Sequence, residues 1–374
     1  IGVRLVGSEM CIRDRSYTME RICETLMLLR TKYRFNGYIH VKAIPGAPDE
    51  LLSRAGYLAD RVSINLELPT AQSLSKLAPN KSFKTILEPM EKITGTIAAN
   101  RLALGKDARM ERSSINRYLT GSIFNQNGTH NGQAALSGTQ RTALESGDKL
   151  SLPAVSKDMC VKRPFAPAGQ STQMIIGATP ETDLTLIRTT QHLYKNYDLK
   201  RVFYSAYIPL NEDSALPQLD ADVPLLREHR LYQADWLLRF YGFQADELLS
   251  ESRPNFNEQL DPKCDWAIRH LGQFPVEVQN ASYDMLLRIP GIGPKSARRI
   301  VETRRYAKLD FDILKKIGVV LKRAHYFITC NGRMMYRIPI EESYITSCLT
   351  DDNHKENWEI THQNEKYHQL SLFE

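Results

Sequence analysis

The chain has 374 residues, of which 42% are hydrophobic and 25% are charged, and its formal net charge is +6. This composition indicates a globular protein of two or three domains and excludes a disordered chain. No apolar run approaches the roughly 20 residues needed to cross a bilayer, and no secretory signal is evident, so we expect a cytoplasmic protein without membrane contact. The six cysteines are scattered without a C-x-x-C pair, which predicts neither a disulfide framework nor a metal site built locally by this chain.

Residues 1–15, IGVRLVGSEMCIRDR, show no sustained hydrophobic period. They resemble the translated adapter sequence that contaminates reading frames assembled from short reads. We therefore expect the native chain to begin near Ser16, in the middle of a fold, and we assign Cys11 no function. A genuine but unusual N-terminus is the alternative.

Residues 16–212 alternate between helical and strand patterns. Helices are predicted over 17–33, 48–59, 84–104 and 181–197, and strands over 37–44, 61–68, 173–178 and 201–208. The connections are too long for hairpins, so this order predicts parallel strands with helical crossovers. Four strands cannot close a barrel and the series starts on a helix, so we expect an α/β barrel that lacks its first strands. The buried face of the first helix is predicted to hold Ile22, Leu26, Leu28 and Leu29.

Polar residues alternate with apolar ones along two of the predicted strands. In RVSINLEL, residues 61–68, one face holds Ser63, Asn65 and Glu67. The preceding strand repeats the pattern with Tyr38, His40 and Lys42. A parallel strand covered on both faces should be apolar throughout, so this pattern predicts a solvated, functional interior. A solvent-exposed sheet edge would give the same alternation.

Four segments of this region carry a family resemblance. YIHVKAIPGA, VSINLELPT, RPFAPAGQSTQMIIGATPET and RVFYSAYIPL resemble strands three to six of the partial barrel of radical S-adenosylmethionine enzymes. With the helical segment REHRLYQADWLLRFYGF and the glycine-rich motif described below, the order is similar to the radical SAM family of DNA modification or repair linked to uracil-DNA glycosylase-like proteins. The resemblance implies a 4Fe-4S cluster and S-adenosylmethionine as cofactors. The family's C-x-x-x-C-x-x-C loop is absent, which loss of the first strands would explain, so we expect this fragment to be inactive.

The resemblance also implies positions for the cofactor and the substrate. The implied cofactor-binding residues are Ser63, Asn65, Glu67, Gln173, Ile175, Gly177 and Glu181. Gly177 would permit close backbone approach, and Glu181 is predicted in the first turn of a helix, where a carboxylate is favoured in any case. The catalytic candidates are His40, Lys42 and Tyr207, although a lone His or Tyr on a strand is as often a satisfied core residue.

Two segments read as connections. Between about residues 106 and 161 the composition turns to Ser, Thr, Asn, Gln and Gly, which predicts a disordered insertion in a barrel loop. Residues 213–255 contain a predicted amphipathic helix, 225–243, which we expect to bridge the barrel and the next domain.

Residues 282–305, SYDMLLRIPGIGPKSARRIVETRR, predict two short helices around a Pro-Gly-Ile-Gly turn. The first amides of the second helix lack intrahelical acceptors and favour an anion such as a DNA phosphate. The pattern resembles the helix-hairpin-helix module of DNA-repair proteins. The predicted DNA-binding residues are Pro290, Gly291, Ile292, Gly293, Lys295, Arg298 and Arg299. An ordinary helical turn with a solvated basic face is the alternative.

An internal repeat supports the module. The pattern Asp284-x-Leu-x-x-Ile-x-Gly returns, one residue shorter, at Asp312-x-Leu-x-x-Ile-Gly, which predicts an all-α tandem helix-hairpin-helix domain over 256–340. Residues 284–323 hold eleven Lys or Arg against four Asp or Glu. The positive charge is thus concentrated on this segment, as expected of a phosphate-binding surface.

Residues 341–374 are polar, and we expect a disordered tail that ends in the apolar pentapeptide QLSLF. It resembles the peptide that bacterial repair and replication proteins insert into the DNA sliding clamp. The predicted anchors are Gln369, Leu370, Leu372 and Phe373. A chance apolar tail that packs back on the protein is the alternative.

The sequence as a whole predicts a radical SAM enzyme that acts on DNA in modification or repair. The predicted partners are DNA, the sliding clamp and a uracil-DNA glycosylase-like protein. The alternative function is a non-catalytic DNA-binding adaptor of repair. A metal-dependent barrel nuclease is disfavoured, because no His and Asp cluster with ligand spacing is present.

Overall fold

The structure is a computed structural model that describes residues 15–110, 152, 163–209, 216–218 and 222–350. The chain divides into two compact units, residues 1–258 and 259–374. Across the described ranges, no helix is both long enough and apolar enough to cross a membrane.

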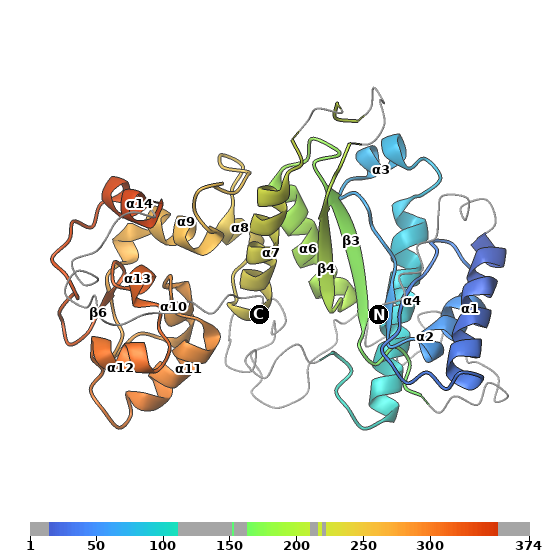
Figure 1. Ribbon diagram of the computed structural model, residues 1–374, viewed down its shortest axis with the longest axis horizontal. Coiled ribbons are helices and arrows are strands. Elements are labelled where there is room, and N and C mark those ends of the chain that lie inside the picture. The colour runs from blue at the N-terminus through green and yellow to red at the C-terminus, as the bar shows by residue number, and fades with distance from the viewer. Residues whose placement is uncertain (1–14, 111–151, 153–162, 210–215, 219–221, 351–374) are drawn as a thin grey trace. The chain divides into compact units, whose positions relative to one another are not determined.

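The first unit is built on a four-stranded parallel sheet (Figure 1). Its strands are β1 (His40–Lys42), β2 (Arg61–Ser63), β3 (Gln170–Ile176) and β4 (Arg201–Ala206). Its helices are α1 (Arg15–Thr31), α2 (Asp49–Leu58), α3 (Ala71–Leu77), α4 (Phe83–Ala103), α6 (Asp183–Tyr197), α7 (Leu225–Phe240) and α8 (Ala245–Leu248). The strands are neighbours in the order in which they occur in the chain, β1-β2-β3-β4. The first unit is thus a mixed α/β fold with a parallel sheet in sequential strand order.

The helices of this unit pack on one another in chain order, α1 on α2, α2 on α4, α4 on α6 and α6 on α7. Beneath them, apolar side chains from the strands are removed from water. Met174 of β3 and Val202 of β4 are fully buried, as are Ile86 of α4 and Ile187 of α6. Each such side chain contributes roughly 2 kcal/mol through its burial, which makes this layer the core of the unit.

Strands β1, β2 and β4 are shorter than the sequence predicts, whereas β3 begins three residues earlier, at Gln170. The segment 61–68 is a strand only as far as Ser63, and the left-handed φ of 66° at Glu67 interrupts the extended backbone. Ser63 and Asn65 are buried, as are Val62 and Ile64, so both faces of this segment are covered and the predicted solvated face is not present here. Helix α3 was not predicted.

Helix α1 forms where expected, and of its predicted buried face Leu26 is buried while Ile22 and Leu29 are half-buried. Met19, Cys23 and Leu26, spaced i, i+4 and i+7, are buried, whereas Leu28 is 50% exposed. The prediction that Leu28 is buried is wrong. Helix α1 packs mainly on α2 alone, so its buried stripe is narrow.

The ends of the predicted insertion are packed rather than disordered. Ala108, Met110 and Leu152 are buried. The Met110 amide donates to the Asp198 carboxylate at 2.8 Å, and the Leu152 amide donates to the Thr96 hydroxyl at 2.8 Å. Residues 111–151 and 153–162 lie outside the description.

Helix α7, expected to be a bridge, is an integral part of the first unit. It packs on both β4 and α6, and Tyr194 of α6 donates a hydrogen bond to the buried Asp235 of α7 at 2.5 Å. Its side chains also close the outer edge of β4. The Tyr204 amide donates to the Tyr232 hydroxyl at 3.0 Å, and that hydroxyl donates back to the Tyr204 carbonyl at 2.7 Å. The Glu228 carboxylate accepts from the Ala206 amide, which also points away from β3, at 2.6 Å.

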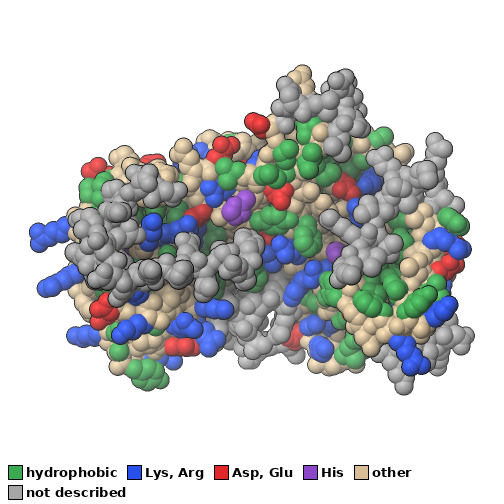
Figure 2. Space-filling model, in the orientation of Figure 1, with side chains coloured by type: hydrophobic (Ala, Val, Ile, Leu, Met, Phe, Trp, Pro, Cys, Tyr) green, Lys and Arg blue, Asp and Glu red, His purple; other side chains and the backbone are tan. Residues whose placement is uncertain are grey.

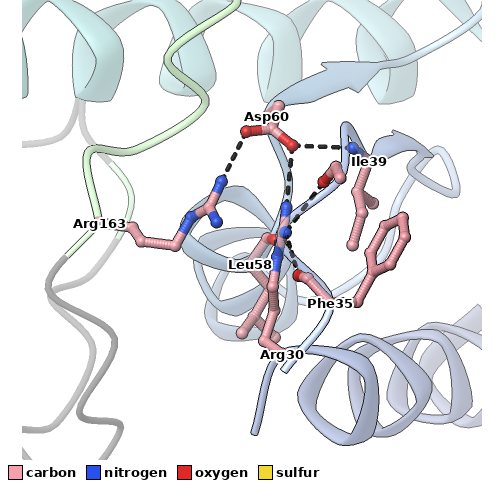
Figure 3. A network of polar contacts seen from close by, with 7 residues as sticks. Arg30, Phe35, Ile39, Leu58, Asp60 and Arg163 are labelled. Carbon is pink, nitrogen blue, oxygen red and sulfur yellow. Dashed lines mark hydrogen bonds and ion pairs between the residues drawn. The ribbon is translucent and has the colours of Figure 1, made fainter. Parts of the chain in front are cut away.

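Asp60, at the start of β2, fastens the beginning of the sheet to α1 (Figure 3). Its carboxylate accepts from the Arg30 guanidinium at 2.8 Å, the Arg163 guanidinium at 2.5 Å and the Ile39 amide at 2.7 Å. Arg30 also donates to the carbonyl of Leu58 at 3.0 Å. The Arg30 side chain is only 4% exposed, so this ion pair is shielded from water.

The second unit is mainly helical. Its helices are α9 (Pro262–Arg269), the 3-10 turn η3 (Leu271–Gln273), α10 (Tyr283–Arg288), α11 (Pro294–Thr303), α12 (Phe311–Lys316), α13 (Leu321–Ala324) and α14 (Glu342–Thr350). It is not all-α as predicted, because β5 (Val276–Glu277) and β6 (Ile328–Thr329) form a small parallel pair. The ordered fold also extends beyond residue 340, since α14 packs on α9 and buries Ile345. Residues 351–374, including the clamp-like peptide with Gln369, Leu370, Leu372 and Phe373, lie outside the described residues.

Candidate nucleic-acid interface

The predicted hairpin forms between α10 and α11. Ser282 begins α10, and its hydroxyl accepts from the Met285 amide at 3.1 Å. Leu286, Leu287 and Ile289 of the first arm are fully buried, as is Ile292 in the turn at 1% exposed. The packing of these apolar residues fixes the angle between the two helices and thereby supports the turn.

Gly291 is required by the turn for two reasons. Its φ is +81°, in the left-handed region that favours glycine. A Cβ at this position would lie 2.4 Å from the Val320 carbonyl oxygen and 3.1 Å from the Ala324 amide nitrogen. The Gly291 carbonyl in turn accepts from the Val320 amide at 2.9 Å. The first hairpin is therefore seated directly on the second.

The N-terminus of α11 offers amides for an anion. Gly293 is the N-cap and has no side chain to accept from them, and Pro294 occupies the first position without an N–H. The next amides have no intrahelical acceptor, and the helix dipole makes this end positive. Lys295 is exposed beside them and makes no hydrogen bond or ion pair with any residue in the described ranges. Together these groups can bind a phosphate.

The structure gives the two predicted arginines other contacts. Arg298 donates to Glu302 at 2.9 Å on the exposed side of α11. Arg299 donates to the Ile317 carbonyl, at the end of α12, at 3.1 Å. Arg299 thus joins the two hairpins, and a phosphate contact from it would compete with this hydrogen bond.

The repeated pattern folds as a second helical hairpin from α12 to α13. Asp310 caps α12 by accepting from the Ile313 amide at 2.7 Å, and Gly318 turns the chain with φ +92°. Ser296 of α11 donates to the Gly318 carbonyl at 2.7 Å, so each turn contacts the other hairpin. Lys316 and Lys322 are exposed on either side of this turn. Figure 2 shows Lys and Arg side chains, in blue, spread over the surface of this unit.

A buried lysine that the sequence analysis missed lies under the first turn. Lys263, in α9, is 8% exposed, and its ammonium donates to the Ile292 carbonyl at 2.6 Å. Burial lowers the pKa of Lys263 to about 7. The sequence Asp261-Pro262 marks the start of a helix, but no local pattern indicates that the next side chain points inward.

In the first unit, the strand register places the predicted polar residues on one face of the sheet. His40 is in register with Arg61, and Lys42 with Ser63. Ser63 is in turn in register with Ser171. Register partners in a parallel sheet share a face, so the polar residues predicted on separate strands are brought together. His40 lies 3.4 Å from the Ser171 hydroxyl on an exposed position of β1, and partial desolvation of its ring together with Arg61 lowers the pKa of His40 to about 4.

Several of the implied cofactor residues already have hydrogen-bond partners within the first unit. The Asn65 amide donates to Gln173 at 3.3 Å. Glu67 accepts from Lys81 at 3.2 Å and lies 3.8 Å from Lys42. Ser63 and Asn65 are each only 5% exposed, and Ser63 donates to the Val41 carbonyl at 3.4 Å. These contacts stabilise the sheet, whether or not a ligand binds there.

The remaining candidates lie near the carboxyl ends of β3 and β4. Ile175 is half-buried on β3, and Gly177 follows with φ +87°. The Tyr207 amide donates to the Ile176 carbonyl at 2.8 Å, which continues the pairing beyond β4.

Glu181 is not in the first turn of α6 as predicted. Thr182 caps that helix, and Glu181 precedes it. Its carboxylate accepts from the Thr70 hydroxyl at 2.7 Å. Burial alone would raise the pKa of Glu181. Hydrogen bonds from Ser73, Thr179 and Thr70 outweigh it and lower this pKa below its usual value.

The described cysteines do not fit an iron-sulfur cluster. They are Cys23 of α1, Cys264 of α9, Cys330 directly after β6 and Cys348 of α14, and all four are buried. Burial raises the pKa of Cys23 to about 11 and that of Cys330 to about 12, which disfavours the thiolates that iron needs. Over the described part of the chain, no group of three His, Cys, Asp or Glu side chains could hold a metal ion.

Comparison with known proteins bears on the second unit alone. The family described as helix-hairpin-helix motif matches residues 276–303, which cover β5, α10, the Gly291 turn and α11. No curated protein and no solved structure matches the chain. The motif supports DNA as a partner of this protein.

Proposed function

We propose that the second unit binds DNA through the amides at the start of α11 and the exposed Lys295. The observation that carries the proposal is the Gly291 turn, which lies within the matched motif and packs against the second hairpin. This turn leads into α11, whose positively polarised N-terminus has no side-chain cap. Backbone amides contact phosphates and not base edges, so binding should show little sequence preference.

Salt dependence tests this proposal. If about three or four phosphates are neutralised, log K should fall against log salt with a slope near −3. Lys295→Glu should weaken binding by about tenfold, because it replaces an attractive contact by a repulsive one at the phosphate. Lys84→Glu, an equal charge change at an exposed residue of α4, is the matched control and should leave binding unaltered. A flat salt dependence, or equal binding by the two variants, would contradict the proposal.

We further propose that the first unit is the partial barrel of a radical SAM enzyme of DNA modification or repair, with a uracil-DNA glycosylase-like protein as a partner. The sequential order of four parallel strands and the polar residues on one sheet face support this proposal. The described cysteines do not fit the cluster, so no chemical step is assigned to it. The adaptor function remains the second candidate.

Binding of S-adenosylmethionine to the full chain separates the two candidates. Saturable binding in equilibrium dialysis, weakened by Gln173→Leu, supports the enzyme. Absence of binding by a chain that still binds DNA supports the adaptor. Gln273→Leu, the same change at an exposed residue of the second unit, is the control.

A further inference from the structure

Two successive carbonyls of the turn between α10 and α11 accept hydrogen bonds from other elements of the second unit. The Gly291 carbonyl accepts from Val320, and the Ile292 carbonyl accepts from the Lys263 ammonium at 2.6 Å. The carbonyl and the N–H of one trans peptide unit point in opposite directions. The Ile292–Gly293 unit, whose carbonyl is directed to Lys263, therefore directs the Gly293 N–H away from Lys263. This N–H belongs to the N-cap of α11, where the phosphate is proposed to bind.

The charged groups that act most strongly on Lys263 include two arginines and one aspartate. It is the second residue of α9, and Asp261, which caps α9, accepts from the Lys263 amide at 3.1 Å. Arg288 of α10 and Arg323 of α13 also face it, as does the neutral Cys264 thiol. Asp261 is the one acid among these groups, and Arg323 pairs with it at 3.1 Å. A buried ammonium in such a site is held in its charged form only weakly.

We propose that Lys263 is a positioning residue for DNA binding, which orients the hairpin turn toward the phosphate and takes up a proton when the phosphate binds. This inference rests on the proposed DNA binding by the second unit. A phosphate adds negative charge on the opposite side of the peptide unit that Lys263 contacts, so it favours the protonated ammonium. The protonated lysine in turn polarises that peptide and makes its N–H a better donor.

The sign of the pH dependence follows from linkage. The free protein loses the Lys263 proton near pH 7, and the complex loses it at higher pH because the phosphate stabilises the ammonium. DNA binding should therefore take up a proton between these two values, and affinity should fall as pH rises above about 7. Each pKa unit by which DNA raises the value corresponds to about a tenfold loss of affinity across the transition.

Binding of a fluorescent duplex by the full chain at constant ionic strength, from pH 6 to pH 9, tests the inference. The wild type should lose up to about tenfold in affinity over this range. Lys263→Arg, which stays charged, should bind without this loss, and Lys263→Met should bind weakly at every pH and without the slope. Lys295→Glu is the control, since it should weaken binding but keep the slope. Calorimetric titrations in two buffers of different ionisation enthalpy should show proton uptake by the wild type and not by Lys263→Met.

The outcomes separate this inference from the proposed function. If the wild type binds DNA with the expected salt slope but shows the same pH profile as Lys263→Arg and takes up no proton, the role of Lys263 is refuted and DNA binding stands. If the wild type does not bind the duplex at all, both proposals fail. The comparison of wild type with Lys263→Arg decides the matter even if Lys263→Met does not fold.

Discussion

Replacing Gly291 by alanine should destabilise the second unit more than the same change at any other glycine tested in it. Two costs add at this position. The φ of +81° is strained for a residue with a Cβ by about 1–2 kcal/mol. The added Cβ would also lie 2.4 Å from the Val320 carbonyl oxygen, a backbone atom that cannot rotate away. Separating the two hairpins to relieve this contact costs about 1–3 kcal/mol and weakens a hydrogen bond worth about 1 kcal/mol.

Two other glycines of the same unit separate these costs. Gly332 has a φ of +73° but open space around its Cβ position, so Gly332→Ala isolates the backbone strain. Gly272 has neither a positive φ nor a neighbour within 4 Å, so Gly272→Ala should change stability by less than about 0.5 kcal/mol. We expect losses of about 3–5 kcal/mol for Gly291→Ala and about 1 kcal/mol for Gly332→Ala, because alanine also restricts the unfolded chain.

Urea unfolding followed by the fluorescence of Trp266 measures these differences. Trp266 is 3% exposed in α9, and Trp236→Phe with Trp358→Phe would leave it as the sole tryptophan, so the signal would report on the second unit. Equal losses for Gly291→Ala and Gly332→Ala would refute the close approach of the two hairpins. A loss below about 1 kcal/mol for Gly291→Ala would refute the strained turn as well.

Three further predictions concern other parts of the chain. Asp60→Asn should lower the free energy of unfolding of the first unit, measured in urea, by about 3 kcal/mol, because it leaves Arg30 buried without its charge partner. Asp49→Asn removes one partner of a more solvated ion pair and should cost under about 1 kcal/mol. Equal costs for the two variants would contradict the role of burial. A synthetic peptide of residues 360–374 should bind the bacterial sliding clamp with roughly micromolar affinity in calorimetry. The double substitution Leu372→Ala and Phe373→Ala should abolish that binding. Equal binding by the two peptides would identify QLSLF as a chance tail. Anaerobic reconstitution with iron and sulfide should load no cluster on this chain, and about four irons per chain would overturn that expectation.

The hairpin could be predicted from sequence because its determinants are local. Gly291 and Pro294 are three residues apart, and the buried leucines of α10 lie within five residues of the turn. The alternation of helices and strands was predictable for the same reason, since each element has its own period. The local pattern could not predict the close approach of the second hairpin. The Val320 carbonyl, 29 residues further along the chain, leaves no room for a Cβ at Gly291.

Where the predictions were wrong, either a helix cap or a partner distant in the sequence decided the outcome. Leu28 is exposed because α1 has essentially one helix to pack against and needs only a narrow face. Glu181 lies outside α6 because Thr182 accepts from the Thr185 amide at 3.3 Å and begins the helix there, which leaves the glutamate to bind Thr70. The burial of Lys263 depends on the packing of α9 against the hairpin turn, which hydrophobic periodicity does not encode.

The two edges of the parallel sheet differ, and the difference bears on the fold proposed for the first unit. At β4, Tyr232 and Glu228 of α7 satisfy outward backbone groups, so no further strand can pair there. At β1, the backbone of Ile39 pairs with β2, and because amides alternate sides along a strand, those of His40 and Lys42 point to the outer edge.

Those outward amides have no acceptor within the described ranges, so the sheet can be extended at β1 alone. A radical SAM barrel whose strands three to six are β1 to β4 would receive its earlier strands at this edge and not at the other. A DNA-binding adaptor with a catalytically inactive barrel would have the same open edge. The edge at β1 therefore bears on the fold proposed for the first unit and not on whether that unit is an enzyme.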